Sequence, residues 1–218
     1  MIFNLTIKHF NLEEVRKAYS EGNLLAFAPL MDSLISRNVP LKSTNLDRRL
    51  IHYWESRELF AVVEENGYLS FFDICWLNVL QELKALGVTR KVMSEVHKFY
   101  FGNDSFLEAM FSNVKIEEFV LPLEKLGELP KDVDLVKMLK GFGFNNFTLS
   151  IIAIMLTRKN TCLHVSSGGK VAAFEVDNII NHLDPNVVLN ELFNGSFISI
   201  SLYKIIYKVI DDNELFSL

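Results

Sequence analysis

The chain has 218 residues, of which half are apolar, and it contains only 10 glycines and 5 prolines, a composition that excludes a disordered protein and is typical of a globular one. The formal charge of −5 is uneven, because residues 1–100 carry 12 basic and 12 acidic residues whereas residues 101–218 carry 10 and 15. A polyanion is therefore expected to bind the first half, and its zero net charge argues against strong nonspecific DNA binding.

Cysteine usage and hydropathy indicate the cellular environment. Cys75 and Cys162 lie far apart and form no CxxC pair, which argues against a disulfide-stabilised secreted scaffold. Residues 1–10 lack the basic start and long apolar core of a signal peptide. The longest apolar stretch, residues 147–156, is far shorter than the ~20 residues of a membrane span. We therefore expect a cytoplasmic protein without a membrane partner.

The first hundred residues are predicted to be mostly helical. Alternating side chains predict a short strand at 3–7, and a helix is expected at 13–20, before Gly22. The next predicted helix begins at Pro29 and ends near Pro40. Only residues 39–44, with Ser43 or Thr44 able to cap, separate it from a helix over residues 45–58. This spacing predicts a helix-turn-helix.

A turn-bearing stretch follows the second of these helices. Residues 63–68 contain Asn66-Gly67, and together with residues up to 70 they form a candidate hairpin wing. Apolar periodicity then predicts helices over 72–86 and 92–101, the first closed by Gly87 and the second capped by Thr89.

The second half is predicted to be a small acidic α/β domain with an antiparallel sheet. A turn cluster at residues 102–104 coincides with the change in charge, so we expect domains at 1–102 and 103–218 and an α+β fold overall. The elements expected after the boundary are short helices at 106–111, 116–126 and 135–140, a buried helix at 147–156 that periodicity alone does not distinguish from a strand, a hairpin of 161–166 and 170–176, a helix ending at Gly195, a strand at 197–201 and a last helix through 205–210.

Two stripes of side chains follow the helix predicted over residues 45–58. Helical spacing gathers an apolar set and, on the other side, a short, polar, cationic set. The apolar set is Leu46, Leu50, Tyr53 and Trp54, and the polar set is Asn45, Arg49, His52 and Ser56. The polar stripe suits a helix laid in the major groove of DNA.

Five sequence landmarks occur in order between residues 29 and 101. They are Arg49-Leu50-Ile51-His52-Tyr53-Trp54-Glu55, Glu58-Leu59, Gly67-Tyr68, Ser70-Phe71-Phe72-Asp73-Ile74, and residues 80–89. Together they resemble the winged helix-turn-helix of the MerR family of transcription regulators, whose recognition helix has the pattern R-x-L-R-Y-Y/W-E. The chain departs from the family at Leu69, where an arginine is usual, in a shorter wing, and in the absence of a long dimerisation helix and of metal-binding cysteines.

The resemblance implies a bacterial DNA-binding regulator. Residues 45–58 would read the major groove of double-stranded DNA, and the wing would approach the backbone. The chain would act as a homodimer, with residues 103–218 supplying dimerisation or the sensing of an unknown small-molecule or protein effector. The residues expected at DNA are Lys42, Thr44, Asn45, Arg48, Arg49, His52, Tyr53, Arg57, Asn66 and Tyr68.

Other interpretations of the same residues stay open. Arg48, Arg49 and Arg57 could form a solvated helix face paired with Asp47, Glu55 or Glu58. His52 fits groove contact and an ordinary surface histidine equally, and Tyr53 and Trp54 favour the core, with the Tyr53 hydroxyl able to reach a phosphate. An interaction module that has lost DNA binding and docks another protein is the alternative function, favoured by the neutral first half and the short wing.

Catalysis and metal binding have no positive signal in the sequence. Residues 166–170 do not match a phosphate-binding loop, because His164 and Val171 stand where the motif needs glycine and serine or threonine. Cys162 and His164 face the same side of a predicted strand, but no third metal ligand is evident. We therefore expect no enzymatic activity, no metal site and no cofactor.

Overall fold

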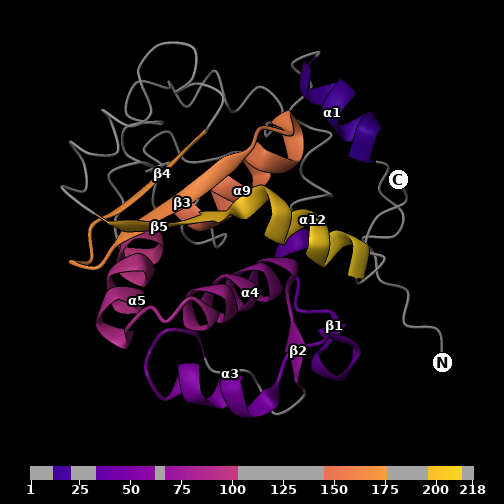
Figure 1. Ribbon diagram of the computed structural model, residues 1–218. Helices are drawn as coiled ribbons and strands as arrows, with labels where there is room; N and C mark the ends of the chain where they lie inside the picture. Colours follow the sequence, from indigo (N-terminus) through magenta and orange to yellow (C-terminus); the bar gives the residue numbers. More distant parts are fainter. Residues whose placement is uncertain (1–11, 21–32, 62–66, 103–144, 176–195, 213–218) are drawn as a thin grey trace, which may run out of the picture.

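A computed structural model describes residues 12–20, 33–61, 67–102, 145–175 and 196–212 (Figure 1). These parts combine helices with antiparallel strands, so the α+β class is confirmed. The elements in chain order are α1 (Leu12–Ser20), β1 (Val39–Pro40), the 3-10 turn η3 (Leu41–Ser43), α3 (Arg48–Glu55), β2 (Tyr68–Leu69), α4 (Phe71–Ala85), α5 (Arg90–His97), the π-helical turn η4 (Lys98–Gly102), α9 (Asn146–Thr157), β3 (Thr161–Ser166), β4 (Val171–Glu175), β5 (Phe197–Ser201) and α12 (Leu202–Asp212).

A two-stranded antiparallel sheet joins the segments that precede and follow α3. Val39 pairs with Leu69 and Pro40 with Tyr68, and the Leu41 N–H donates to the Gly67 carbonyl at 2.7 Å. Pro40 is tolerated because it lies in an edge strand, where its missing N–H leaves no bond unmade. The segment from Leu41 to Gly67, which contains α3, is therefore closed at its base by main-chain pairing.

This small sheet changes two predictions about the winged region. The expected link of residues 39–44 contains β1 and η3 rather than a simple turn, and only residues 33–35 of the preceding helix are described as helical. The expected wing at 63–70 pairs with β1, which lies before α3, through its described residues 67–69. Residues 62–66 lie outside the described parts, as do the strand predicted at 3–7 and the helices predicted between 106 and 140.

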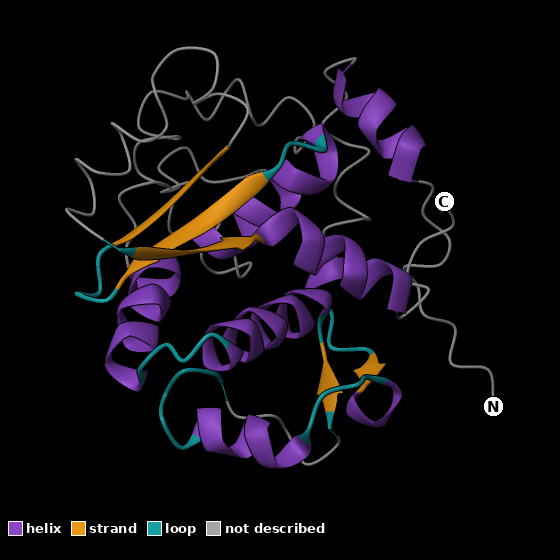
Figure 2. Cartoon of the chain, in the orientation of Figure 1, coloured by secondary structure: helices purple, strands orange, loops and turns teal. Residues whose placement is uncertain are grey.

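A three-stranded antiparallel sheet forms the other β region, in the order β4-β3-β5. The register runs from Thr161↔Glu175 to Val165↔Val171 in the hairpin, and Gly169 takes a φ of +84° in the turn, a conformation that glycine adopts without a steric penalty. The predicted hairpin, the strand at 197–201 and the last helix are therefore confirmed. Residues 147–156 are helical, as part of α9. Figure 2 shows the two sheets in separate places, with α4 between them.

Helix α4 is the centre of the core. Nine of its side chains are buried, and a capping box fixes its start, because Ser70 and Asp73 each accept the other's backbone N–H. Helix α12 packs against α4, α9 and β3. Buried apolar residues from Leu12 to Ile210 form one cluster, so the described parts of both halves share a core. The domain boundary at residue 102 stays a prediction, because residues 103–144 are not described.

Trp76 on α4 ties together segments that are distant in the sequence. Its indole N–H donates to the Leu59 carbonyl at 2.8 Å, just after α3. Its ring meets the edges of Tyr100, Phe101 and Phe147, with centroids 6.0, 4.9 and 5.1 Å away. Edge-to-face pairs of this kind add to the apolar burial. The exit of α3, the turn η4 and the start of α9 therefore converge on one side chain.

Trp76→Phe should lower the free energy of unfolding by about 1–3 kcal/mol through the unpaired Leu59 carbonyl, in addition to the lost ring volume. Trp54→Phe is the matched control, because Trp54 is equally buried but its indole N–H has no hydrogen-bond partner among the described residues. Urea unfolding of both variants separates the hydrogen bond from packing. A Trp54→Phe variant that loses as much stability as Trp76→Phe would contradict the role given to this bond.

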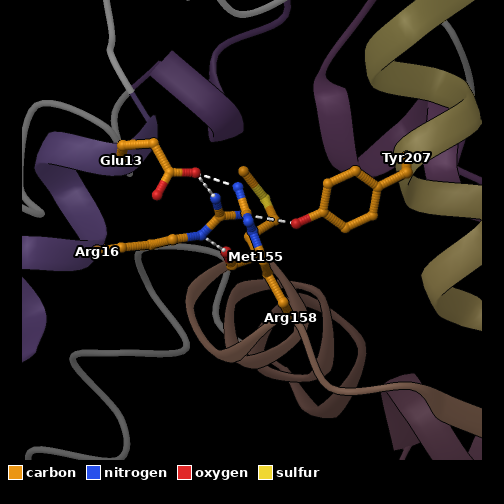
Figure 3. Close-up of polar contacts among 5 residues, drawn as sticks. All are labelled: Glu13, Arg16, Met155, Arg158 and Tyr207. Carbon is orange, nitrogen blue, oxygen red and sulfur yellow. Dashed lines mark hydrogen bonds and ion pairs between the residues drawn. The ribbon is translucent and has the colours of Figure 1, made fainter. Parts of the chain in front are cut away.

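Helix α1 is held against the second half of the chain by Arg16 (Figure 3). The Arg16 Nε donates to the Met155 carbonyl at 2.7 Å, and its terminal nitrogens contact the Tyr207 hydroxyl and the Glu13 carboxylate. Arg158 contacts the same carboxylate. Because the last carbonyls of a helix have no partner within it, Arg16 caps α9 from outside. Helix α1 therefore packs on α9, although the sequence placed it in the first domain.

Arg16→Lys should destabilise the protein by about 1–3 kcal/mol, because one ammonium does not reproduce the planar set of donors that reaches both Met155 and Tyr207. Chemical denaturation of the full chain measures this loss. Lys208→Ala, at an exposed position of α12, is the control and should change stability little. Equal effects of the two substitutions would show that the Arg16 contacts add nothing to stability.

Candidate nucleic-acid interface

Helix α3 is shorter than predicted at both ends. It begins at Arg48 and ends at Glu55, so the expected bounds of 45 and 58 were wrong. Asp47 is the N-cap, and its carboxylate accepts the Arg49 N–H at 2.9 Å. Thr44 is engaged before the helix, because its hydroxyl donates to the Leu41 carbonyl at 2.7 Å. Asp47 therefore takes the capping role that the sequence gave to Ser43 or Thr44.

The two faces of α3 differ sharply in exposure. Ile51 and Trp54 are buried, whereas Arg48, Arg49 and His52 are exposed. The predicted apolar stripe was partly wrong: Leu46 and Leu50 are half-buried, and Tyr53 is 41% exposed. Ile51 and Trp54, three residues apart, are the buried residues of this short helix, and Leu50 packs partly buried against the core beside them. The cationic stripe with Arg49 at its centre lies on the surface, as expected.

The Tyr53 ring lies close to two cations, one from the turn after α3 and one from α4. The Arg57 guanidinium lies 5.5 Å from the centroid of its ring, and the Lys84 ammonium, at the end of α4, lies 5.7 Å from it. Both distances fall within the range of cation–π attraction. Lys84 was missed by the sequence analysis, although inward-facing Leu80 and Leu83 imply that it points outward. We define the cationic surface as Arg48, Arg49, His52, Tyr53, Arg57 and Lys84.

The arginines of this surface are available for an external anion. Arg48, Arg49 and Arg57 form no ion pair within the described parts of the chain, so the expected alternative of pairing with Asp47, Glu55 or Glu58 is not observed. His52 differs, because its Nδ1 lies 2.7 Å from a Glu55 carboxylate oxygen. A guanidinium without an acidic partner can grip phosphate or guanine with two parallel hydrogen bonds.

The other predicted DNA contacts lie outside α3, and several of them are already engaged or half-buried. Lys42 is exposed in η3, and the Thr44 hydroxyl is used within its own turn. Asn45 is exposed but precedes the helix, and it lines a separate cavity of about 160 Å³ beside α12. Tyr68 is half-buried in β2, and Asn66 lies outside the described residues. Leu69, which stands where the family has arginine, is fully buried in the core.

The chain leaves α3 through a left-handed residue. Glu58 has a φ of +57°, the Glu58 N–H donates to the Glu55 carbonyl, and the Leu59 N–H donates to the Trp54 carbonyl at 3.0 Å. This arrangement satisfies carbonyls at the end of the helix, and glycine is the usual residue at its left-handed position. The turn buries Leu59 and leaves Arg57 beside Tyr53.

No protein-family model, curated protein or solved structure matches the chain. The MerR resemblance therefore stays a prediction from the sequence landmarks. Within the described parts, no helix is both long and apolar enough to cross a membrane, and no group of three or more His, Cys, Asp or Glu side chains is placed to hold a metal ion.

The Cys162–His164 pair on β3 belongs to the protein interior. The His164 ring stacks on Phe174, with centroids 4.2 Å apart, and also contacts Phe197. Burial lowers the pKa of His164 and raises the pKa of Cys162. Both side chains are buried, and within the described parts they belong to no group of three or more metal-binding side chains.

Glu58→Gly should raise the free energy of unfolding by about 0.5–1 kcal/mol. It removes a left-handed penalty of about 1–2 kcal/mol, and the extra freedom of glycine in the unfolded chain offsets part of the gain. Thermal unfolding measures the change. Glu58→Ala removes the same charge but keeps the penalty, so a glycine variant no more stable than the alanine variant would refute the strain at this position.

Proposed function

We propose that the protein is a DNA-binding transcription regulator that lays α3 in the major groove of double-stranded DNA. The observation that carries this proposal is the exposure of Arg48 and Arg49 on a helix whose other side is anchored by Ile51 and Trp54. An α-helix fits the width of the major groove, where base edges present a distinct pattern of donors and acceptors. The sequence landmarks of the MerR family support the same proposal.

Arg48 and Arg49 are given the base-reading role. They stand at the start of α3, and recognition helices contact base edges mainly with their first residues. Guanine is the expected partner, because an arginine can bond its O6 and N7 atoms together. His52 lies one turn further along and exchanges its bond to Glu55 for one to DNA.

Arg57, Lys84 and Lys42 are given the phosphate-holding role. Arg57 and Lys84 flank the exposed Tyr53, so the aromatic ring keeps two mobile cations together at the far end of α3. Lys42 is exposed on the segment that precedes the helix. Contacts at both ends of α3 would fix its register on the duplex without reading the sequence. Because one such module makes few contacts, we propose a homodimer in the cytoplasm, acting on a two-fold site.

Arg49→Ala should weaken binding to selected DNA fragments by about tenfold, through the loss of a bidentate base contact. Wild-type affinity should fall steeply as salt rises, because each phosphate neutralised releases counterions. Arg57→Ala should weaken binding to all sequences alike and lower the salt dependence by about one unit of slope. Fluorescence anisotropy with fragments selected from pooled genomic DNA measures these effects.

Lys159→Ala is the matched control, because it also removes one positive charge but lies just after α9, where it pairs with Glu175. Its affinity should equal that of the wild type. If no binding to pooled fragments is detected at low salt, or if Arg49→Ala and Lys159→Ala behave alike, the regulator proposal fails.

The second candidate is a protein-interaction module that uses the same face. Among the described residues, Tyr53 and Leu86 are the large hydrophobic side chains that are exposed, at 41% and 49%, and both lie close in sequence or space to Lys84. Buried Leu69 also supplies no wing cation. A protein partner would lose affinity with Tyr53→Ala and Leu86→Ala, whereas DNA binding would tolerate Leu86→Ala.

A further inference from the structure

A second feature of the described residues is a cavity of about 280 Å³ between the exit of α3 and the start of α9. Leu59, Phe60 and Ala61 form one side of it, and α9 contributes Phe147 and Thr148. Exposed residues, Arg37 and Ala61, lie at its rim, which gives a path from solvent. An engineered apolar cavity of about 150 Å³ holds benzene, so this one has room for one or two rings.

Aromatic side chains dominate the walls of the cavity. Phe60, Phe72, Trp76, Phe101 and Phe147 all line it, and four of them are buried, Phe101 being half-buried. Rings of this kind bind flat apolar surfaces by stacking and edge contacts. A planar aromatic molecule therefore matches the walls better than an aliphatic or a sugar-like one.

The polar groups of the cavity leave one hydrogen-bonding position. Ser70 and Asp73 cap α4, and Asn145 and Thr148 cap α9, so their side chains are engaged by backbone groups. Arg37 pairs with Asp73 at 3.0 Å, which leaves the rim without net charge. His97 is the exception, because its ring contacts Trp76 and Phe101 but forms no hydrogen bond within the described residues.

The backbone at His97 is also unusual. Helix α5 ends there and continues as the π-helical turn η4, which stacks the His97 ring on Phe101, with centroids 4.8 Å apart and planes inclined by 27°. Such π-helical turns concentrate at functional sites. Burial lowers the pKa of His97, so its ring is neutral at pH 7 and presents one donor and one acceptor nitrogen.

We propose that this cavity binds a neutral, planar aromatic molecule of one or two rings that carries a hydrogen-bonding group, such as an indole or a phenol, with His97 as its polar partner. Leu59 and Phe60 follow the three-residue turn after α3, and the Leu59 carbonyl accepts a hydrogen bond from Trp76, so the bound molecule would contact the segment that connects the cationic surface to α4. Its action as an effector of DNA binding rests on the proposed function, whereas the binding site does not.

The test uses 5-fluoroindole as the probe and the full chain without DNA. Fluorine NMR of the probe should show saturable broadening with the wild type. His97→Phe keeps the stacked ring and should weaken binding about fivefold by removing one hydrogen bond. Ile35→Phe, which adds volume at the cavity wall, should abolish binding. His164→Phe alters the other buried, stacked histidine, outside the cavity, and should leave the affinity unchanged.

A second probe keeps the proposal open to refutation if one variant fails to fold. An indole carrying a carboxylate, 5-fluoroindole-2-carboxylate, should bind at least tenfold more weakly, because Arg37, the cation among the described lining residues, is paired with Asp73. Absence of saturable 5-fluoroindole binding at millimolar concentration, binding that survives Ile35→Phe in a folded variant, or equal binding of the charged probe overturns the assignment.

The effector role has its own readout. Saturating 5-fluoroindole should change the affinity of the wild-type protein for DNA at least twofold. The affinity of the folded Ile35→Phe variant for DNA should be the same with and without the probe. If the probe binds but DNA affinity does not move, the effector role is overturned and the cavity assignment stands. If the protein binds the probe but no DNA, the regulator proposal fails and the effector role fails with it.

Discussion

The hydrogen bond from the Trp76 indole to the Leu59 carbonyl is the constraint on which the arrangement of the functional parts depends. It fixes the first residue of the chain that is buried after α3, and it does so from the middle of α4. The same ring is packed against Tyr100, Phe101 and Phe147, which come from η4 and α9. Because protein interiors are close-packed, a shift in any of these three segments is felt at the others.

The bond between Trp76 and Leu59 helps to explain how α3, a helix of eight residues, can present a stable cationic surface. A helix this short is marginal by itself, so its stability comes from its surroundings. The Asp47 cap fixes the start, Ile51 and Trp54 fix the rotation about the axis, and the left-handed Glu58 fixes the exit. Within the described parts, the side chains of Arg48 and Arg49 therefore form no hydrogen bond or ion pair that holds the fold together. Arg16 in α1 differs, because its guanidinium contacts three partners.

Sequence reasoning succeeded where signals are local and failed where they are not. The hairpin around Gly169 and the cap at Thr89 follow from residues within one or two turns of each other, so they could be predicted, whereas the apolar run of α9 left a helix and a strand open. The pairing of β1 with β2 involves two residues on each strand from opposite sides of α3, which is too short for any periodicity to register. Lys84 belongs to the cationic surface through a contact between α3 and α4. The aromatic cavity is formed by segments that only the tertiary fold brings together.

The clamp made by Arg16 has a consequence for how the chain is made. Helix α1 is synthesised before Met155 and Tyr207, which receive the Arg16 guanidinium and lie 139 and 191 residues further along the chain. Contacts of such long sequence separation slow folding. The face of α1 that carries Arg16 therefore has no partner until both α9 and α12 have been synthesised, so these contacts can form only late in folding.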